Sequence, residues 1–420
     1  MTIRAFSGGA GCGKTYRLMQ ALIEHLVATP LMDGQKVLAL TFMHGSRRRL
    51  EERLGQLQGL RGRMECSTVD SFAWRLVRRW SSLVTKLGFT NIEVDQYDRV
   101  CDAAGALLQV KEVCGWVAAT FPVLLVDEAQ DLTPNRLRLV SGLATRLEVF
   151  AAADEFQCLN EDLRPNPTCT WLEQVCGVEE LKQPRRTSVA ELLDAAAAIR
   201  NGDAPKSGKL VAVAQTSNSG LAGTWLTHAL AWYGGGKSVA VITPTLGKFA
   251  KDTLTWSAQN RTKKGAGPYV LSWEESEAQA ADKFVSTLAL KEVNDIPFVV
   301  DLLTTAGDFR ATADVVEWMH MQRRTRAKET FSREEIAKAI KQGFAQRRRS
   351  RKVDEGGWKG MTVHGAKNRE FDNVIVLWPA AVVGSDDQKR RLLYNAITRA
   401  KQRCLVLVQA KSSLAHAPFV

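Results

Sequence analysis

The 420-residue sequence lacks several features that would place it in common classes of protein. No apolar run reaches the roughly 18 residues that a transmembrane helix requires. The eight cysteines form no CxxC pair and no zinc-like spacing with histidine, which favours reduced thiols over disulfides or a metal centre. The few residues before the glycine-rich segment at residue 8 leave no room for a secretory signal peptide. Together these absences predict a soluble cytoplasmic protein with no membrane partner.

The balance of charge is the most informative bulk property. The formal net charge is +12, whereas the 45% hydrophobic and 24% charged residues are ordinary for a globular protein. A basic surface favours a polyanionic partner, because neutralised phosphates release their counterions. Charge alone does not identify that partner, since many basic proteins bind no nucleic acid. The length suffices for two or three domains, each with its own core.

Short apolar runs without polar alternation recur in both halves of the chain. They cover residues 1–7, 37–42, 121–126, 147–153, 238–242, 373–377 and 403–408. Segments with helical spacing separate them, as in the recurrence of Leu18, Leu22 and Leu26. Such strands, separated by helices, are typical of a parallel sheet that is covered on both faces. The sequence therefore predicts an α/β fold built on parallel sheets.

The same pattern predicts two domains. We expect the first over residues 1–195 and the second over residues 196–420. Helical patterns at about 74–118 and about 275–355 interrupt the alternation of strands and helices, and we expect them to be small, mostly helical insertions. Within the second insertion, Ser332-Arg333-Glu334-Glu335 has the spacing of a capping box, which predicts that a helix begins there.

A glycine-rich segment follows the first apolar run and opens a helical pattern. It reads Gly8-Gly9-Ala10-Gly11-Cys12-Gly13-Lys14-Thr15. This matches the phosphate-binding pattern GxxxxGK[ST] in full, in the strand–loop–helix context that confirms it. Its glycines let backbone N–H groups curl around phosphates at a helix N-terminus. We expect Lys14 to reach the outer phosphates and the Thr15 hydroxyl to ligate Mg²⁺.

Two adjacent carboxylates, Asp127 and Glu128, directly follow the apolar run at 121–126. At the tip of a strand, Asp127 is expected to hold Mg²⁺ directly or through water, and Glu128 to accept a proton from the attacking water. A charged loop after a strand is common in proteins. Its place downstream of a phosphate-binding loop nevertheless favours hydrolysis, with ATP and Mg²⁺ as the ligands.

The run Asp127-Glu128-Ala129-Gln130-Asp131 resembles motif II of the UvrD/Rep-like superfamily 1A DNA helicases. Further segments similar to that family's motifs follow in the family's order along almost the whole chain. Their colinear order carries the resemblance, because each segment alone is weak. The resemblance implies two RecA-like P-loop domains that hydrolyse ATP in the cleft between them, in a compact variant with small accessory insertions.

Three of these segments imply contacts with a DNA strand. Thr41-Phe42 resembles motif Ia, whose phenylalanine stacks on a base in the family. Residues 67–72 resemble the family's TxxSF motif, which contacts the DNA backbone, and residues 361–372 resemble motif V. The residues that the resemblance assigns to nucleic acid are Thr41, Phe42, Thr68, Ser71, Thr362 and His364.

Other segments imply a nucleotide site that is shared by both domains. Residues 154–157 resemble motif III, residues 181–187 motif IV and residues 393–401 motif VI. An arginine supplied by the second domain would stabilise charge on the transferring phosphoryl group. The resemblance assigns Gln157 as the γ-phosphate sensor, Arg186 as a γ-phosphate ligand, Arg399 as the arginine finger and Glu370 as the ribose ligand.

The chain departs from the family where the base is held. No glutamine precedes the phosphate-binding loop, and Arg185 stands in place of the tyrosine that stacks on adenine. Arg185 is therefore a candidate base contact, and selectivity for ATP stays open. Asn368 stands where the family prefers glycine. Two basic tracts, residues 75–79 and 347–352, are either nucleic-acid contacts or solvated surface.

These observations predict a single-strand-stimulated ATPase that acts as a DNA translocase or helicase, with a 3′ to 5′ direction implied by the resemblance alone. Two alternatives remain. One is a nucleic-acid-binding ATPase switch that never unwinds, and the other is a motor that acts on RNA. The short insertions leave open whether the chain separates strands or only translocates, and whether a duplex junction or a protein partner takes part.

Overall fold

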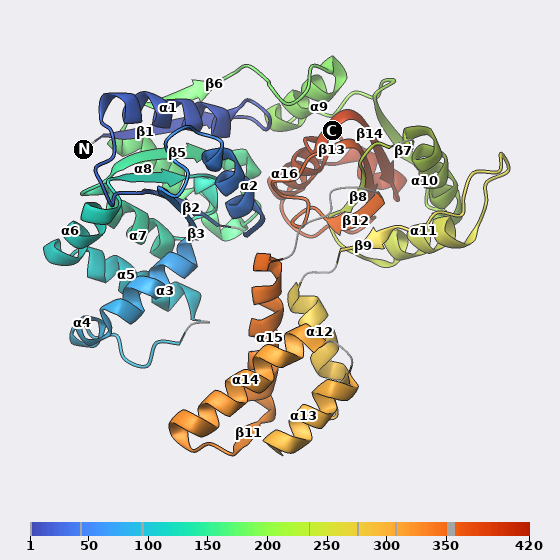
Figure 1. Cartoon of the computed structure of the whole chain (residues 1–420). Helices are drawn as coiled ribbons and strands as arrows, with labels where there is room; N and C mark the ends of the chain where they lie inside the picture. The colour runs from blue at the N-terminus through green and yellow to red at the C-terminus, as the bar shows by residue number, and fades with distance from the viewer. Residues whose placement is uncertain are drawn as a thin grey trace. The chain divides into compact units, whose positions relative to one another are not determined.

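The computed structural model describes residues 2–42, 44–93, 96–234, 236–274, 277–306, 309–350 and 358–420; the side chains of residues 44–46, 277–279, 309–311 and 345–350 are outside the description. The chain folds into two compact units. One consists of Met1–Leu271 with Thr362–Val420, and the other of Ser272–Met361. The first unit is α/β with parallel sheets, which confirms the predicted fold class, and the second is mostly helical (Figure 1).

The first sheet of the larger unit has six parallel strands in the order β3-β2-β4-β5-β1-β6. The strands are β1 (Ile3–Gly8), β2 (Val37–Thr41), β3 (Met64–Thr68), β4 (Val123–Val126), β5 (Glu148–Ala153) and β6 (Val178–Leu181). All residues of β2 and β4 are buried. This burial explains their unbroken apolar sequence, because each central strand has helices over both of its faces.

Alternate residues of one strand enter different cores. Leu38 and Leu40 of β2 belong to the cluster that contains buried residues of α3, α5, α6 and α7, whereas Val37 and Ala39 join the cluster of α1 and α2. Figure 1 shows α1 on one side of the sheet and α5, α6 and α7 on the other. The helices are α1 (Lys14–Ala28), α2 (His44–Gly55), α3 (Val69–Arg79), α4 (Ser81–Lys86), α5 (Tyr97–Leu108), α6 (Lys111–Thr120), α7 (Pro134–Ala144) and α8 (Pro167–Val175).

The helices between β3 and β4 overlap the insertion expected at about 74–118. They share one buried cluster with the sheet, through residues such as Phe72, Leu76, Val100 and Val117. This stretch is therefore helical, as the sequence indicated, and it forms the cover of one sheet face.

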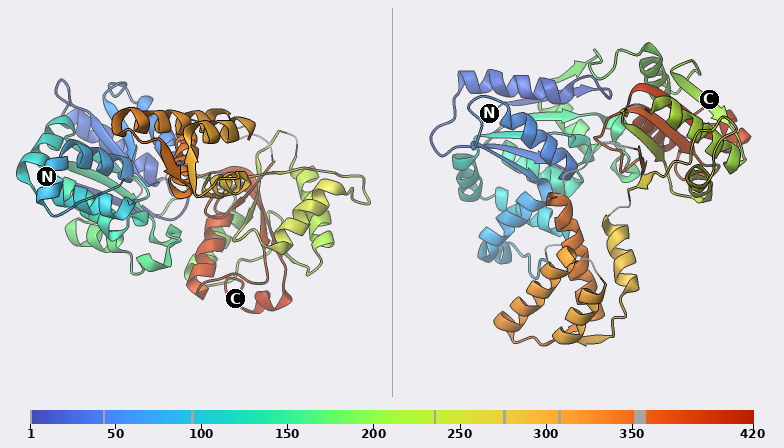
Figure 2. Two further views of the ribbon diagram at one scale, coloured as in Figure 1. Left: turned by 90° about the horizontal axis from the view of Figure 1, so that it is seen from below. Right: turned by 45° about the vertical axis from the view of Figure 1, so that its right-hand side comes forward.

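The second sheet of the larger unit contains β7 (Val211–Gln215), β14 (Ala400–Val408), β13 (Phe371–Trp378) and β8 (Val239–Thr243), adjacent in that order and parallel. Its core strands are as apolar as those of the first sheet, and Val374 to Leu377 are completely buried. The accompanying helices are α9 (Ala190–Asn201), α10 (Ser219–Tyr233), α11 (Lys248–Gln259) and α16 (Asp386–Ile397). Figure 2 gives two further views of these elements.

The smaller unit packs its helices around a core that includes Val299, Leu303, Met319, Phe331 and Ile336. Its elements are β9 (Ser272–Trp273), α12 (Glu277–Thr287), β10 (Val293–Asp295), α13 (Ile296–Thr305), α14 (Phe309–Arg326), β11 (Thr330–Ser332), α15 (Arg333–Ser350) and β12 (Trp358–Thr362), the last of which ends in the larger unit. The predicted capping box is confirmed at the start of α15. The Ser332 N–H donates to Glu335 Oε2 over 3.0 Å, and the Glu335 N–H donates to Ser332 Oγ over 3.2 Å.

None of the helices in the described part of the chain is both long and apolar enough to cross a membrane.

The predicted motifs of the first half follow the carboxyl ends of the first sheet's strands. Gly8 ends β1, Thr41 ends β2 and Thr68 ends β3, while Asp127 follows β4 and Asp154 follows β5. Because these strands are parallel, all five positions lie at one edge of the sheet, where α/β proteins bind their ligands.

Candidate nucleotide site and nucleic-acid interface

The phosphate-binding loop adopts a backbone that favours glycine. Gly11 and Gly13 have φ of 82° and 79°, in the left-handed region. A Cβ atom added to Gly11 would lie 2.8 Å from Cβ of Arg186, and one added to Gly13 would lie 2.6 Å from Cδ of Arg185. The loop therefore accepts only glycine at these positions, both for its own curvature and for the close approach of the two arginines.

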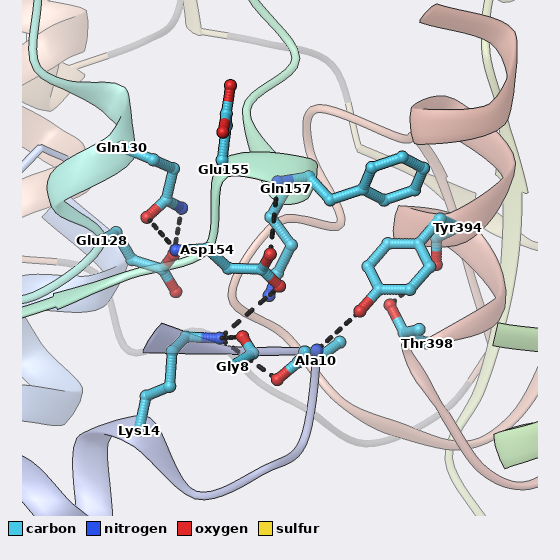
Figure 3. A network of polar contacts seen from close by, with 12 residues as sticks. Gly8, Ala10, Lys14, Glu128, Gln130, Asp154, Glu155, Gln157, Tyr394 and Thr398 are labelled. Carbon is cyan, nitrogen blue, oxygen red and sulfur yellow. Dashed lines mark hydrogen bonds and ion pairs between the residues drawn. The ribbon is translucent and has the colours of Figure 1, made fainter. Parts of the chain in front are cut away.

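Lys14 begins α1 and points back over the loop. Its Nζ donates to the carbonyl oxygens of Gly8 and Gly9 over 2.8 and 3.2 Å and lies 3.7 Å from Oδ2 of Asp154. The Lys14 side chain is only 9% exposed, and that of Asp154 is fully buried. The cation thus sits at the mouth of the loop, with a buried carboxylate as its counter-ion (Figure 3).

Thr15 and Asp127 bring two hard oxygen atoms together. The Thr15 hydroxyl donates to Oδ2 of Asp127 over 3.1 Å. Burial, and then the charge of Glu128, raises the pKa of Asp127 to about 6, although Thr15 and Lys14 oppose this rise. A divalent cation would favour the charged form of Asp127, and hydroxyl and carboxylate oxygens are the ligands that Mg²⁺ prefers. This donor pair fits Mg²⁺.

Glu128 stands in an uncommon backbone conformation. Its φ of 56° lies in the left-handed region, which side chains other than glycine rarely adopt. Its Oε2 accepts a hydrogen bond from Nε2 of Gln130 over 2.6 Å. The strained backbone and this amide together fix the direction of the carboxylate, and such outliers cluster at functional sites.

Gln130, Asp154 and Gln157 form a buried polar network beside Lys14 (Figure 3). The Asp154 N–H donates to Oε1 of Gln130 over 3.0 Å, and Nε2 of Gln157 donates to Oδ2 of Asp154 over 2.6 Å. The oxygen of the Gln157 amide accepts from Nη2 of Arg399 over 3.1 Å. The network therefore runs from the phosphate-binding loop to an arginine that precedes β14 of the second sheet.

The side chain of Arg399 is completely enclosed by protein. It also donates from Nε to the Asn395 carbonyl over 3.0 Å, and its burial, followed by the charge of Arg186, lowers its pKa to about 10. Its described hydrogen-bond partners are neutral oxygens, so they do not neutralise the buried charge of the guanidinium. Binding of an anion there is therefore favourable. Electrostatically, Arg399 is thus suited to a phosphate.

Arg186 and Glu370 form an ion pair next to the loop. Nε of Arg186 donates to Oε1 of Glu370 over 2.8 Å, and Nη1 donates to the Thr398 carbonyl over 2.7 Å. Burial favours the neutral form of Glu370, but the charges of Arg186 and Lys401 outweigh it and lower the pKa of Glu370 to about 2. The Glu370 carboxylate is therefore held by cations in this structure.

Arg185 lies beside a tyrosine that the sequence interpretation did not single out. Its backbone N–H donates to the Gly11 carbonyl over 2.6 Å, and its guanidinium carbon is 4.2 Å from the ring centroid of Tyr16. Tyr16 is 48% exposed, so the stacked pair is open to solvent at the start of α1. The position of Tyr16 next to Thr15 is the only signal in the sequence that points to it.

The residues assigned to nucleic acid differ in exposure. Phe42 is 38% exposed, and the guanidinium carbon of the buried Arg136 lies 5.3 Å from its ring centroid. Thr41 is buried at the end of β2. Thr68 is also buried and caps α3, where its Oγ1 accepts from the Ser71 N–H over 3.2 Å and donates to Ser71 Oγ over 2.8 Å. Only Phe42 of these four thus presents a large open surface.

Thr362 ends β12, and His364 belongs to the turn that follows this strand. Oγ1 of Thr362 accepts from the Gly365 N–H over 3.2 Å, and His364 is exposed. In the described part of the chain, neither residue shares a hydrogen bond with Phe42, Thr68 or Ser71. Asn368, in the same turn, has a φ of 61°. The position therefore needs a residue that tolerates the left-handed region, as asparagine and glycine do.

Of the two basic tracts, the structure describes the side chains of the first only. Arg79 lies over the ring of Trp116, with its guanidinium carbon 4.2 Å from the centroid, and Arg75 pairs with Glu65. Both arginines thus have partners within the chain, although both are exposed. The tract at 347–352 lies outside the residues whose side chains are described, so its role stays a prediction.

Two family models match the chain. The AAA domain matches residues 2–161, which contain the phosphate-binding loop and the carboxylates after β4. The UvrD-like helicase C-terminal domain matches residues 361–407, which contain Glu370 and Arg399. Together the two matches support a UvrD-like superfamily 1 helicase.

Among solved structures, this UvrD-like chain is similar to a complex of Arterivirus nonstructural protein 10, a helicase, with DNA. The two share 13% identity with a TM-score of 0.40, over 98% of this chain and 62% of that one. A crystal structure of Arterivirus nonstructural protein 10 has 11% identity and a TM-score of 0.42, over 99% of this chain and 62% of that one. This chain therefore spans less than two thirds of each viral protein chain. No curated protein matches it.

A buried ion pair links two of the UvrD-like motifs. Nζ of Lys367 lies 2.6 and 2.7 Å from the two carboxylate oxygens of Asp131, and the side chains are 8% and 9% exposed. Asp131 ends the short helix after β4, and Lys367 lies in the turn after β12. Neither residue was singled out as functional from the sequence. Charged residues within two motifs were the available signal, but they did not show that the two would meet.

Proposed function

We propose that this UvrD-like chain is an ATP-driven motor on single-stranded DNA, a translocase or helicase that moves 3′ to 5′. The observation that supports the proposal is the series of contacts from Lys14 through Asp154 and Gln157 to Arg399. The series joins the phosphate-binding loop beside one sheet to an arginine beside the other. Phosphate bound at the loop would therefore change the contacts that hold the two sheets together.

In the proposed reaction, Lys14 and the backbone of the loop bind the phosphates. Thr15 and Asp127 hold Mg²⁺, which supplies neutralisation of phosphate charge when it is bound. Glu128 accepts the proton of the attacking water, and Gln157 senses the γ-phosphate. Arg186 and Arg399 stabilise charge on the transferring group. Arg185 and Glu370 hold the base and the ribose, as the resemblance implies.

The strand is proposed to bind along the carboxyl edge of the first sheet. Phe42 stacks on a base, while Thr41, Thr68 and Ser71 contact the backbone, and Thr362 with His364 forms a second grip. A stacked base contributes about 1–3 kcal/mol, and the excess of basic residues favours a polyanion. We assign the two RecA-like domains to residues 1–195 and 196–420. DNA as the strand and the direction of movement rest on the family resemblance.

The first test is hydrolysis of ATP with no strand, with single-stranded DNA and with RNA of the same sequence. We expect DNA to increase turnover. If no strand increases it, the motor proposal is wrong, and stimulation by RNA alone would assign the motor to RNA. Omission of Mg²⁺ is expected to abolish turnover in every arm.

The second test uses tailed duplexes of both polarities. Displacement from the 3′-tailed duplex alone supports the proposed direction, and displacement from the 5′-tailed duplex alone reverses it. Hydrolysis that is stimulated by DNA without displacement or movement along a single strand would favour the ATPase switch. The matched control is Lys14→Ala, in which strand binding should persist without turnover.

A further inference from the structure

A tyrosine beside the second sheet reaches the phosphate-binding loop. Tyr394 lies in α16 and is 2% exposed. Its hydroxyl oxygen accepts a hydrogen bond from the Ala10 N–H over 2.7 Å, and a Cβ atom added to Gly9 would lie 3.1 Å from that oxygen. Figure 3 shows the hydroxyl directed at the loop. The phenol oxygen therefore lies against the backbone that is proposed to bind phosphate.

Two neighbours hold the phenol in this direction. The ring of Phe156 meets that of Tyr394 edge-on, with centroids 5.0 Å apart and planes at 89°. Nη1 of Arg200 donates to Oδ1 of Asp154 over 3.0 Å and lies 3.4 Å from the Tyr394 oxygen, to which it also donates. Asp154 is the same carboxylate that faces Lys14. Arg200 thus joins the tyrosine to the network of the nucleotide site.

The hydrogen of the Tyr394 hydroxyl is left for another group. A phenol has one hydrogen to donate, and its oxygen already accepts from Ala10 and Arg200. In the described part of the chain, no acceptor for that hydrogen accompanies these two bonds. Burial, followed by the charge of Asp154, raises the pKa of Tyr394 to about 12, so the hydroxyl stays protonated at neutral pH. The loop therefore faces a neutral donor.

We propose that Tyr394 is a further catalytic residue, whose hydroxyl donates a hydrogen bond to the terminal phosphate of the bound nucleotide, and that Arg200 is its positioning residue. This inference rests on the proposed nucleotide hydrolysis. Phosphate oxygens are acceptors, and a fixed donor in a buried site stabilises the charge that develops on them during transfer. Tyr394 belongs to α16, one of the helices that accompany the second sheet. Its hydrogen bond to the phosphate therefore also links the occupancy of the loop to that sheet.

The alternative for Tyr394 is that it only packs. Phenylalanine would preserve the edge-on contact with Phe156 and remove only the hydroxyl. Tyr394→Phe therefore separates the two roles. A matched control is Tyr233→Phe, which removes the hydroxyl of another buried tyrosine. Tyr233 is 7% exposed at the end of α10, and its ring stacks on that of Trp232 with centroids 5.8 Å apart.

The experiment compares kcat, KM for ATP and melting temperature in the wild type, Y394F and Y233F, with and without single-stranded DNA. We expect Y394F to lower kcat about 100-fold, which is the effect of removing one donor to a developing oxyanion. KM, melting temperature and strand affinity should change little in Y394F, and Y233F should keep kcat. A Y394F variant that keeps kcat within about twofold of the wild type would overturn the proposal, as would a loss confined to KM or to melting temperature.

A second variant covers the case in which Y394F does not fold. Arg200 is 39% exposed, and Arg200→Met leaves the phenol in place while removing one of its donors. We expect about a tenfold fall in kcat with unchanged melting temperature, in keeping with the loss of a charge-assisted hydrogen bond. Unchanged kcat contradicts the positioning role. If Y394F loses turnover but DNA never stimulates the wild type, the motor proposal fails and this inference stands.

Discussion

The ion pair between Lys367 and Asp131 gives the sharpest test of the structure. Lys367→Met keeps the length of the side chain and removes its charge, which leaves the Asp131 carboxylate buried without its cation. Removing one partner of such a pair costs about 3–5 kcal/mol. Burial, the largest influence, raises the pKa of Asp131 even though the charge of Lys367 lowers it, so the loss of Lys367 raises that pKa further.

Protonation of Asp131 sets an upper limit to this cost. The ordinary pKa of an aspartate is 3.8. If Asp131 must be neutral in the folded state, its protonation costs about 1.4 kcal/mol for each pH unit by which the solution lies above that value. The limit is therefore about 4 kcal/mol at pH 7 and less than half of that at pH 5. Because the folded-state pKa is raised, the deficit is fully present above it and fades as the pH falls towards the unfolded value.

The assay is urea unfolding of the wild type, K367M, D131N and the double variant at both pH values. We expect K367M to lose about 3–4 kcal/mol at pH 7 and less than half of that at pH 5. The double variant should lose less than the sum of the two single variants, because neither charge is then stranded. The control is K389M, since Lys389 pairs with Asp386 over 3.0 Å at an exposed site, where a pair contributes about 0–1 kcal/mol. If K367M loses less than about 1 kcal/mol in its free energy of unfolding, or loses the same amount at both pH values, Lys367 and Asp131 do not form the buried ion pair.

Four further predictions concern the nucleotide site, the strand and local structure. Lys14→Ala should lower turnover by about 100-fold or more while single-strand affinity survives; equal loss of both in a folded variant contradicts its role. Phe42→Ala should weaken single-stranded DNA binding by about 1–3 kcal/mol in fluorescence anisotropy, and unchanged affinity would remove it from the interface. Asn368→Val should cost about 1–2 kcal/mol in thermal unfolding because of the φ of 61°, whereas Asn368→Gly should be tolerated; equal effects would contradict this. Ser332→Ala should cost about 1 kcal/mol and speed hydrogen exchange in the first turn of α15, and unchanged exchange would show that the cap contributes nothing.

Local sequence patterns predicted the parts of the fold that depend on neighbouring residues. The unbroken apolar runs at 37–42 and 121–126 became β2 and β4, because strands covered on both faces need no polar side chains. The capping box at Ser332 was predictable for the same reason, since its two hydrogen bonds span three residues. The pattern at 74–118 showed helices but not the sheet face that they cover.

Part of the candidate site was also predictable from the sequence alone. The phosphate-binding segment and Asp127 were singled out by their residue types and by their place after apolar runs, and the structure joins Thr15 to Asp127. The roles of these residues stay predictions until turnover is measured. Their proximity follows from the parallel sheet, because parallel strands bring their carboxyl ends to one edge.

What the sequence by itself determined is local: where the strands and helices lie, how α15 begins, and which loop has the backbone for phosphate. Only the tertiary structure decided the strand order β3-β2-β4-β5-β1-β6, the burial of Arg399, and the meetings of Asp131 with Lys367 and of Tyr394 with Ala10. The reason is physical. The last two contacts join residues 236 and 384 positions apart, and their free energy depends on the exclusion of water by the whole fold, which no short pattern encodes.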